Sequence, residues 1–389
     1  MFLSGLPLFV GRELHASKAA VGFAVGSFSL TAVFSRPWVG RRIDRWGRRW
    51  FLRGAPVLVA SSAVGLVFAH AYGAIVALRL LQGLAGAAFY TAAATVATDL
   101  APAEQRADYI SRFSLFLYAG FALGPAMGEA IIESRGYEEA WLAAAVASVL
   151  ACTVAFTLPE TRSSHADVVA GTVDLAGLAE PARARRFIHP AALSPGLVLM
   201  TVAVGYTAIS SFAPLYARSI GMGSSGGLYV TFASTILVVR LLSGRLADRF
   251  GRSTVALPGL VAGAFGMLLI AAVQRPVAAF VGVAAFGAGH ALIFPALMAL
   301  TVDSVDERER GEALGSFTAC FDLGASSGGY LVGFVADEAG YRAAWATPAV
   351  LCAIGMVVLV TRVRPQERRA AEARLDADEV PDVATSPVS

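Results

Sequence analysis

Long apolar stretches separated by short polar segments run along the whole chain. Eleven of them are long enough to cross about 30 Å of hydrocarbon as helices. Each is expected to be an α-helix, because lipid offers no partner for an unpaired backbone amide and the alternating pattern of a membrane barrel is absent. They cover residues 21–39, 51–69, 73–98, 110–132, 140–158, 193–216, 227–242, 254–273, 277–302, 314–335 and 343–361. The sequence therefore predicts an all-α, polytopic membrane protein.

The first ten residues are also apolar but are too short to span a bilayer. Residues 6–9 (LPLF) resemble residues 213–216 (APLY), which end a full-length apolar stretch that has room for roughly fifteen to twenty more residues before this point. We therefore expect residues 1–10 to be the second half of helix 1, with its first half upstream of Met1. A cleaved signal peptide is disfavoured, since neither a basic n-region nor a small-residue cleavage site is present.

One charged segment occurs twice, at residues 36–48 and 240–252, a constant spacing of 204 positions from Arg36 to Arg240. At the same spacing Asp99 coincides with Asp303, and Trp141 with Trp345. The residues shared by the two segments are Gly40, Asp44, Arg45, Gly47 and Arg48 in the first copy, and Gly244, Asp248, Arg249, Gly251 and Arg252 in the second. The halves are therefore diverged copies, which is typical of secondary transporters with a substrate site between two bundles.

Composition agrees with a membrane location. With 56% hydrophobic residues, 15% charged residues and a mean hydropathy of +0.64, the chain has more apolar surface than a soluble fold can bury. One side of the predicted topology collects 22 of the 31 Lys and Arg residues and the other side six, so the first side is expected to be cytoplasmic. The predicted location is the cell membrane with a cytoplasmic C-terminus. The net charge of +3 follows from this topology and does not indicate a nucleic-acid partner.

The chain is expected to divide into four parts. Residues 1–160 form a first bundle (helix 1 in part, then helices 2–6), 161–192 a cytoplasmic linker, 193–361 a second bundle (helices 7–12) and 362–389 a disordered tail. The five tryptophans lie near predicted helix ends, where an amphipathic ring prefers the membrane interface. They are Trp38, Trp46, Trp50, Trp141 and Trp345.

The pattern Gly40-x-x-x-Asp44-Arg45-x-Gly47-Arg48 after the second helix, repeated after the eighth, resembles the loop signature of the major facilitator superfamily. The resemblance covers essentially the whole chain and implies two pseudo-symmetric six-helix bundles that rock about a midplane cavity. Helices 1, 4, 7 and 10 would line the cavity, and helices 2, 5, 8 and 11 would lie between the halves. The repeated loops would act as a latch whose salt bridges hold one conformation. The alternative, that the arginines only set topology, does not explain the matching Asp and Gly residues.

Arg36 and Arg240, one turn before the repeated glycines, are expected to anchor this latch. Arg79 is different, because it lies about two turns inside the fourth helix, in a stretch with Gln82 that resembles the family's Arg-x-x-Gln-Gly motif associated with proton coupling. A guanidinium in lipid should face a cavity or a partner, and snorkelling to the periplasmic interface is the alternative.

The fifth helix resembles the family's antiporter signature, in which small residues form a flat stripe for helix packing and a proline bends the helix. Here the residues are Gly120, Gly124, Pro125 and Gly128, and Glu129 replaces the last glycine of the signature. Glu129 lies near the periplasmic end, where contact with water would satisfy it. The resemblance suggests export, and Glu129 is a candidate for proton coupling or substrate binding.

Asp322 in the eleventh helix and His290 in the tenth are the ionisable groups nearest the middle of their helices. Intramembrane charges of this kind usually mark substrate or proton pathways. The alternatives are an ion pair with an arginine for Asp322 and a hydrogen-bonded packing role for His290. With Arg79, Gln82 and Glu129, these two complete the candidate coupling and substrate residues.

Taken together, the sequence predicts a proton-coupled efflux antiporter of a small organic molecule. It is expected to act as a monomer in a lipid bilayer, with protons as the coupling partner and with no cofactor, metal or nucleic acid. A proton-coupled importer of sugars or organic acids and a non-transporting sensor or scaffold stay open as alternatives. ATP-driven transport is disfavoured, because no Gly-x-x-x-x-Gly-Lys-Ser/Thr motif occurs. An enzyme is disfavoured because no metal cluster or serine–histidine pair is spaced for chemistry.

Overall fold

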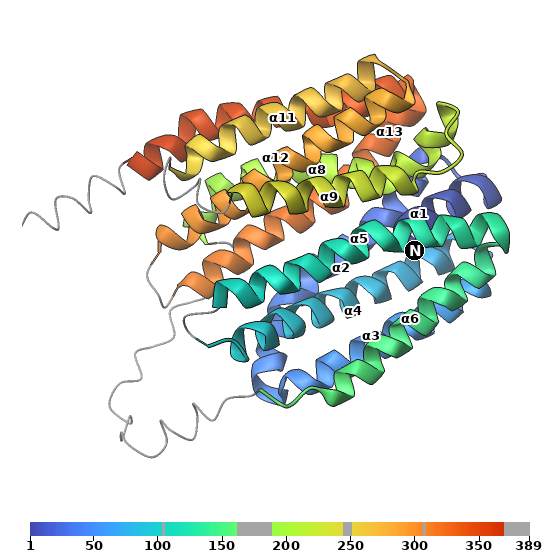
Figure 1. Ribbon diagram of the computed structural model, residues 1–389, viewed down its shortest axis with the longest axis horizontal. Coiled ribbons are helices and arrows are strands. Elements are labelled where there is room, and N and C mark those ends of the chain that lie inside the picture. The colour runs from blue at the N-terminus through green and yellow to red at the C-terminus, as the bar shows by residue number, and fades with distance from the viewer. Residues whose placement is uncertain (103–105, 162–188, 244–250, 306–308, 369–389) are drawn as a thin grey trace, which may run out of the picture.

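The computed structural model describes residues 1–102, 106–161, 189–243, 251–305 and 309–368, and within these ranges the chain folds into helices without β-strands (Figure 1). The helices are α1 (Phe2–Leu8), η1 (Phe9–Glu13), α2 (Lys18–Trp46), α3 (Arg48–Val67), α4 (Tyr72–Asp99), α5 (Arg106–Ser134), α6 (Tyr137–Thr157), α8 (Pro190–Ser219), α9 (Gly226–Ser243), α11 (Arg252–Ala272), α12 (Pro276–Asp303), α13 (Arg310–Val358) and η3 (Leu359–Val363). The all-α prediction is confirmed.

Every apolar stretch predicted to span a membrane lies within helical residues, apart from at most two residues at one end. Ten segments of the described chain have the length and hydropathy of membrane spans, and the last of them, Glu312–Arg368, contains two helices. They join within α13 at Gly340, whose φ of 75° leaves the helical region. We call residues 310–339 the first arm of α13 and residues 341–358 its second arm. These two arms are the two last helices predicted from the sequence.

The helices form two bundles, α1–α6 in the lower part of Figure 1 and α8–α13 in the upper part. We call the end where α2 meets α3, on the left of Figure 1, the basic end. The opposite end, on the right, is where α5 meets α6 and where α13 reverses at Gly340. The bundles lie side by side, with α5 beside α9 and α2 beside the first arm of α13.

The helix before the repeated loop is longer than predicted. The sequence suggested that helix 2 ends at residue 39, but α2 continues to Trp46 and the turn is confined to Gly47. Gly47 has a φ of 89°, and its counterpart Gly251 has the same value. L-residues rarely adopt such a conformation, which accounts for a glycine at this point in both copies. The polar residues between residue 39 and Gly47, which the sequence suggested were a loop, therefore form the last turns of α2.

The same aromatic arrangement occurs in both bundles near the opposite end. Its members are Phe9, Tyr137 and Trp141 in the first bundle and Tyr216, Tyr341 and Trp345 in the second. The ring of Phe9 lies 6.2 Å from Trp141, and that of Tyr216 lies 5.1 Å from Trp345. The similarity predicted between residues 6–9 and 213–216 therefore holds in space.

Two of the tryptophans were wrongly expected at a membrane interface. The exposed fractions of Trp141 and Trp345 are 1% and 2%, because these rings fill the centres of the two aromatic groups. The other three fit the expectation, with exposures of 43% for Trp38, 54% for Trp46 and 73% for Trp50.

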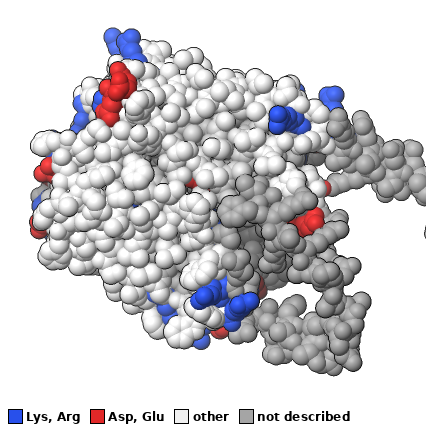
Figure 2. Space-filling view, turned by 180° about the vertical axis from the view of Figure 1, so that it is seen from behind, with Lys and Arg blue, Asp and Glu red and all other residues white. Residues whose placement is uncertain are grey.

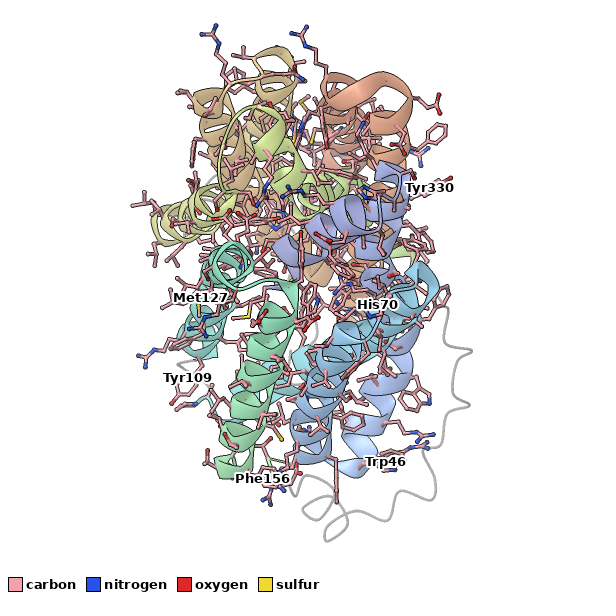
Figure 3. All side chains as sticks on the ribbon, turned by 90° about the vertical axis from the view of Figure 1, so that its right-hand side faces the viewer. Trp46, His70, Tyr109, Met127, Phe156 and Tyr330 are labelled. Atoms are coloured by element: carbon pink, nitrogen blue, oxygen red, sulfur yellow. The ribbon has the colours of Figure 1, made fainter. Side chains whose placement is uncertain are left out.

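The outer surface suits contact with lipid. Figure 2 shows a broad face with few charged residues, which gather near its edges. Apolar side chains such as Met127 and Phe156 lie about half or more exposed on the outside of the helices, as Figure 3 shows. A soluble protein rarely exposes so large an apolar area, so this surface is one that a bilayer would cover.

Candidate functional site

The two bundles touch most closely where α2 crosses the first arm of α13, towards the opposite end. A Cβ atom added to Gly26 would lie 2.6 Å from the carbonyl oxygen of Ser326, and one added to Gly22 would overlap the carbonyl oxygen of Gly329. The obstacle in both cases is backbone, which cannot rotate away. These small residues therefore allow the two helices to meet backbone to backbone.

Towards the basic end the same two helices are apart. Gly40 of α2 lies on the same helical face as Gly22, and Gly315 of α13 on the same face as Gly329, by the 3.6-residue period. A Cβ atom added to either Gly40 or Gly315 would meet nothing within 4 Å. The bundles are therefore closed against each other at the opposite end and separated along this interface at the basic end.

An ion pair joins the two helices where they begin to part. Arg36 Nε of α2 lies 2.6 Å from Asp322 Oδ2 of α13, and a second guanidinium nitrogen of Arg36 donates to Asp322 Oδ1 at 3.4 Å. The side chain of Asp322 is 6% exposed and that of Arg36 is 27% exposed. The alternative considered for Asp322 from the sequence, an ion pair with an arginine, is therefore present, and the arginine is Arg36, for which the sequence suggested only a latch anchor.

At the opposite end, Glu129 holds the bundles together. Its carboxylate accepts hydrogen bonds from Ser224 Oγ at 2.5 Å, from the Ser225 amide at 2.6 Å and from Ser225 Oγ. These serines precede α9 of the second bundle. Glu129 is 0% exposed, so the expectation that water satisfies it was wrong. The sequence could not show that the turn before α9 would cover the carboxylate.

A second carboxylate makes the reciprocal contact. Asp337 of α13 accepts from the amides of Lys18 at 2.9 Å and Ala19 at 2.8 Å, at the start of α2. Each bundle therefore supplies an acidic side chain to the N-terminus of a helix of the other bundle, where unpaired amides and the helix dipole favour negative charge. An ion pair of 3.2 Å between Arg218 and Glu133 adds to the closure.

The basic end has paired contacts within each bundle. Arg48 lies 3.3 Å from Asp99, and Arg252 lies 3.0 Å from Asp303. These are the acidic positions that the 204-residue spacing had already paired. The repeated loop of each bundle is thus tied to the end of a later helix of the same bundle, which fits the charge pairing expected for the latch.

Sequence reasoning missed two further carboxylates at this end. Glu160 accepts from the amides of Arg48 at 2.9 Å and Arg49 at 3.2 Å. Glu367 accepts from the amides of Arg252 at 2.8 Å and Ser253 at 3.1 Å. They are 207 positions apart, so a search at a fixed spacing of 204 does not align them. The signal that would find them is a proline followed within two residues by a glutamate after the sixth helix of each half, Pro159-Glu160 and Pro365-Gln366-Glu367.

The other predicted latch residues contribute less to the described contacts. Arg45 is exposed. A Cβ atom on Gly47 would lie 2.6 Å from Glu160 Oε2, so its glycine also makes room for this carboxylate. The side chain of Asp44 and the whole of Gly244, Asp248 and Arg249 lie outside the described part of the chain, and their roles stay predictions.

Arg79 is buried inside the first bundle. It is 5% exposed and donates to Gln82 Oε1 at 2.8 Å and to the carbonyl oxygens of Ala24 at 3.3 Å and Val25 at 3.2 Å. Snorkelling to the membrane interface is therefore wrong for this residue. Its partners are neutral, and they fix α4 against α2 directly beside the Gly26 contact with the second bundle.

His290 lies in a group of aromatic rings in the second bundle. Ring centroids lie between 5.6 and 6.5 Å apart within this group, which consists of Tyr206, Phe232, Phe286, His290, Phe294 and Phe321. His290 is 6% exposed, and its Nδ1 has no hydrogen-bond partner in the described structure. The alternative considered from the sequence was a hydrogen-bonded packing residue; the packing is present, and Nδ1 takes no part in a hydrogen bond in the described structure.

The predicted antiporter stripe packs against α1. A Cβ atom on Gly128 would lie 3.1 Å from Ser4 Oγ, and this hydroxyl donates to the Pro125 carbonyl oxygen at 2.9 Å. Gly124 also lies against the first residues of the chain, whereas a Cβ atom on Gly120 would meet nothing within 4 Å. The stripe therefore serves helix packing at Gly124 and Gly128.

Two related helical bundles, closed at one end and joined by an ion pair at mid-height, define a polytopic membrane transporter. The chain belongs to the Major Facilitator Superfamily, whose family model matches residues 1–242 and 223–387. The family predicted from the repeated loop is thereby confirmed.

Relatives cover nearly the whole chain. The staphylopine export protein of Staphylococcus aureus is 27% identical over 365 residues, which are 91% of this chain and 88% of that protein. An uncharacterized MFS-type transporter of Salmonella typhimurium is 26% identical over 362 residues, which are 91% and 90% of the two chains.

Solved structures share the fold. The xylose transporter XylE from E. coli in an inward-open conformation has a TM-score of 0.74 at 16% identity, with coverage of 92% of this chain and 91% of that one. A D-xylose-proton symporter also has a TM-score of 0.74, at 17% identity and 92% coverage of both chains. At this identity the likeness establishes the fold alone.

Proposed function

We propose that this transporter exports a small organic molecule in exchange for protons, by alternating access between its two bundles. The observation that carries the proposal is the Arg36–Asp322 ion pair, which lies between the bundles where α2 and α13 begin to part. A buried carboxylate that pairs with an arginine of the other bundle can couple its protonation to their separation. The 27% identity to a staphylopine export protein supports export as the direction.

We place the basic end in the cytoplasm of a cell with the protein in its cell membrane, because 22 of the 31 Lys and Arg residues belong to that side. The C-terminus is then cytoplasmic, and the arrangement with the bundles separated at the basic end is an inward-facing state. We retain the predicted division into residues 1–160, 161–192, 193–361 and 362–389, and a monomer as the working unit.

In the proposed cycle, Asp322 takes up a proton from outside while the outer end is open and the basic end is closed at Gly40 and Gly315. The protonated transporter then turns inward, and loss of the proton to the cytoplasm forms the ion pair with Arg36 that the inward-facing state contains. The substrate binds from the cytoplasm, and the transporter returns without the proton to the outward-facing state, in which the contact between Gly22 and Gly329 is open. The repeated latch loops stabilise one of these states, and Arg79 with Gln82 keeps α2 and α4 moving together. We assign Glu129 to the outer gate, because its three hydrogen bonds must break when that end opens.

Transport into and out of proteoliposomes tests this proposal. Ligand-induced thermal stabilisation first selects a transported candidate from a panel of small organic molecules. An imposed proton gradient should then drive that compound against its own gradient, in the direction opposite to proton flow. Asp322→Asn should bind the compound but lose the response to the proton gradient, whereas the exposed control Glu139→Gln should retain it.

Three outcomes would count against the proposal. Movement of the compound in the same direction as protons would favour the importer. Binding without transport by the wild-type protein would favour a sensor or scaffold. Proton-driven transport by Asp322→Asn at the wild-type rate would remove this carboxylate from the coupling.

A further inference from the structure

Positive charge exceeds negative charge where the bundles face each other at mid-height. Arg36 of α2 and Arg240 of α9 occupy equivalent positions in the two halves, 204 residues apart. Near the middle of the described spanning helices, Asp322 is the carboxylate at this level, and Arg36 already binds it at 2.6 Å. The pair leaves Arg240 as an additional cation.

The contacts of Arg240 do not supply a counter-charge. Its guanidinium carbon lies 4.9 Å from the ring centroid of Tyr118, which belongs to α5 of the other bundle. Its Nε atom is buried without a hydrogen-bond partner in the described structure, and the neutral Tyr118 hydroxyl is the polar group that interacts with the rest of the guanidinium. Among the described residues no carboxylate forms an ion pair with it. A guanidinium in an apolar region is costly without an anion or a complete set of acceptors.

His290 offers a second unused polar atom on the neighbouring helix. Its ring, on α12, lies 6.2 Å from that of Phe232 on α9, the helix that also carries Arg240, and His290 Nδ1 is buried without a hydrogen-bond partner in the described structure. A neutral imidazole can donate one hydrogen bond, and a guanidinium can donate up to five. An anionic group placed between them would satisfy both residues through charge-assisted hydrogen bonds.

The same region is accessible and aromatic. The side chain of Arg36 is 27% exposed, and Tyr90, whose ring centroid lies 5.8 Å from the Arg36 guanidinium carbon, is 40% exposed. Arg36 is one helical turn from Gly40, where an added Cβ atom would meet nothing within 4 Å. A flat or apolar group could therefore reach the ring of Tyr90 from the basic end.

We propose that Arg240 and His290 bind the anionic group of the substrate, and that the substrate is an organic carboxylate with an aromatic or apolar body that packs on Tyr90. The inference deepens the proposed transport function and rests on it. An organic cation is the competing ligand, because aromatic rings also attract cations. The charges favour the anion, since Arg36 neutralises Asp322 and a cation would meet Arg240.

Binding of three probes of similar shape tests the charge preference. The probes are 2-naphthoate, the neutral 2-naphthamide and the cationic 2-naphthyltrimethylammonium, and the readout is the concentration dependence of thermal stabilisation of the full chain in detergent. We expect 2-naphthoate to bind about tenfold or more tightly than either of the others, because one charge-assisted hydrogen bond accounts for a factor of that size.

Variants then locate the anion. Arg240→Gln should weaken 2-naphthoate about tenfold or more while leaving 2-naphthamide unchanged, and Arg240→Lys should retain part of the preference because it keeps the charge. His290→Phe keeps an aromatic ring and should weaken 2-naphthoate several-fold through loss of one donor. The exposed loop variant Arg275→Gln is the matched control and should bind as the wild type does.

Stronger binding of the ammonium probe, or equal binding of 2-naphthoate by wild type and by both Arg240 variants, would overturn the inference. Its failure is separable from failure of the transport function. Anion binding without proton-driven transport would contradict the transporter proposal and support the site. Proton-driven transport of a cation, unchanged by Arg240→Lys, would support the transporter proposal and contradict the anion site.

Discussion

Gly26→Ala offers a sharp test of how the bundles close at the opposite end, which the proposed orientation places outside the cell and which we call the outer end. The added Cβ atom would lie 2.6 Å from the Ser326 carbonyl oxygen, whereas an ordinary contact needs about 3.4 Å. Since the obstacle is backbone, α2 and α13 must separate by nearly 1 Å. Overpacking of this kind costs about 1–3 kcal/mol. The higher helix propensity of alanine stabilises the closed and open states equally, because residue 26 is helical in both, so it does not change the ratio between them.

A cost of about 2 kcal/mol in the closed form alone shifts the ratio of closed to open outer end about thirtyfold. Thr207→Cys reports this shift, since Thr207 is 3% exposed and lies 3.3 Å from a Cβ atom on Gly329. The background lacks the native cysteines Cys152, Cys320 and Cys352. The rate of labelling by a membrane-impermeant maleimide from outside should rise tenfold or more in Gly26→Ala.

Two matched glycine variants control for general loosening. Gly54→Ala adds its methyl group where nothing lies within 4 Å, on the exposed side of α3, and should leave the labelling rate unchanged. Gly40→Ala is also free of contacts here but would obstruct closure of the basic end, so it should lower the rate. Equal labelling of Gly26→Ala and Gly54→Ala would refute the account of helix contact.

Further predictions concern the charged contacts. Glu129→Gln should raise labelling at Thr207→Cys by tenfold or more, because a buried acceptor of three hydrogen bonds loses its charge; an unchanged rate would show that it is not a gate. In thermal unfolding, Arg36→Gln should lower the unfolding temperature more than Asp322→Asn does, because it leaves the more buried charge, Asp322, without its partner. The double variant should regain much of the lost stability, and a double variant whose loss equals the sum of the two single losses would contradict the pairing. Glu160→Gln should lower the unfolding temperature by an amount corresponding to about 1 kcal/mol, and an unchanged temperature would show that the amides of α3 do not need it.

The architecture could be predicted from the sequence because it follows from composition and repetition. Apolar length located the spanning helices, and the repeated loop revealed the two bundles. The equivalence of residues 6–9 and 213–216 reappeared as matching aromatic contacts of Phe9 and Tyr216. These features depend on the hydrophobicity of each segment and on the local pattern of residues, and both can be read directly from one sequence.

Contacts between the bundles were beyond that reasoning. Asp322 was singled out, but its partner Arg36 lies 286 positions away in the chain and was assigned to the latch instead. Glu129 was expected to meet water, because nothing near it in the sequence shows that Ser224 and Ser225 fold over it. These distances depend on the position and angle at which two helices cross, and the pattern of residues in a single sequence does not specify either.

Distances across both ends, measured on the same protein, test alternating access most directly. Spin labels at Glu138→Cys and Arg275→Cys report the outer end, and labels at Arg45→Cys and Ser304→Cys report the basic end; all four positions are exposed. Double electron–electron resonance spectroscopy should show these two distances changing in opposite directions when the pH is lowered or when Gly26→Ala is introduced. Asp322→Asn should abolish the response to pH. Distances that stay fixed, or that increase together at both ends, would contradict the account.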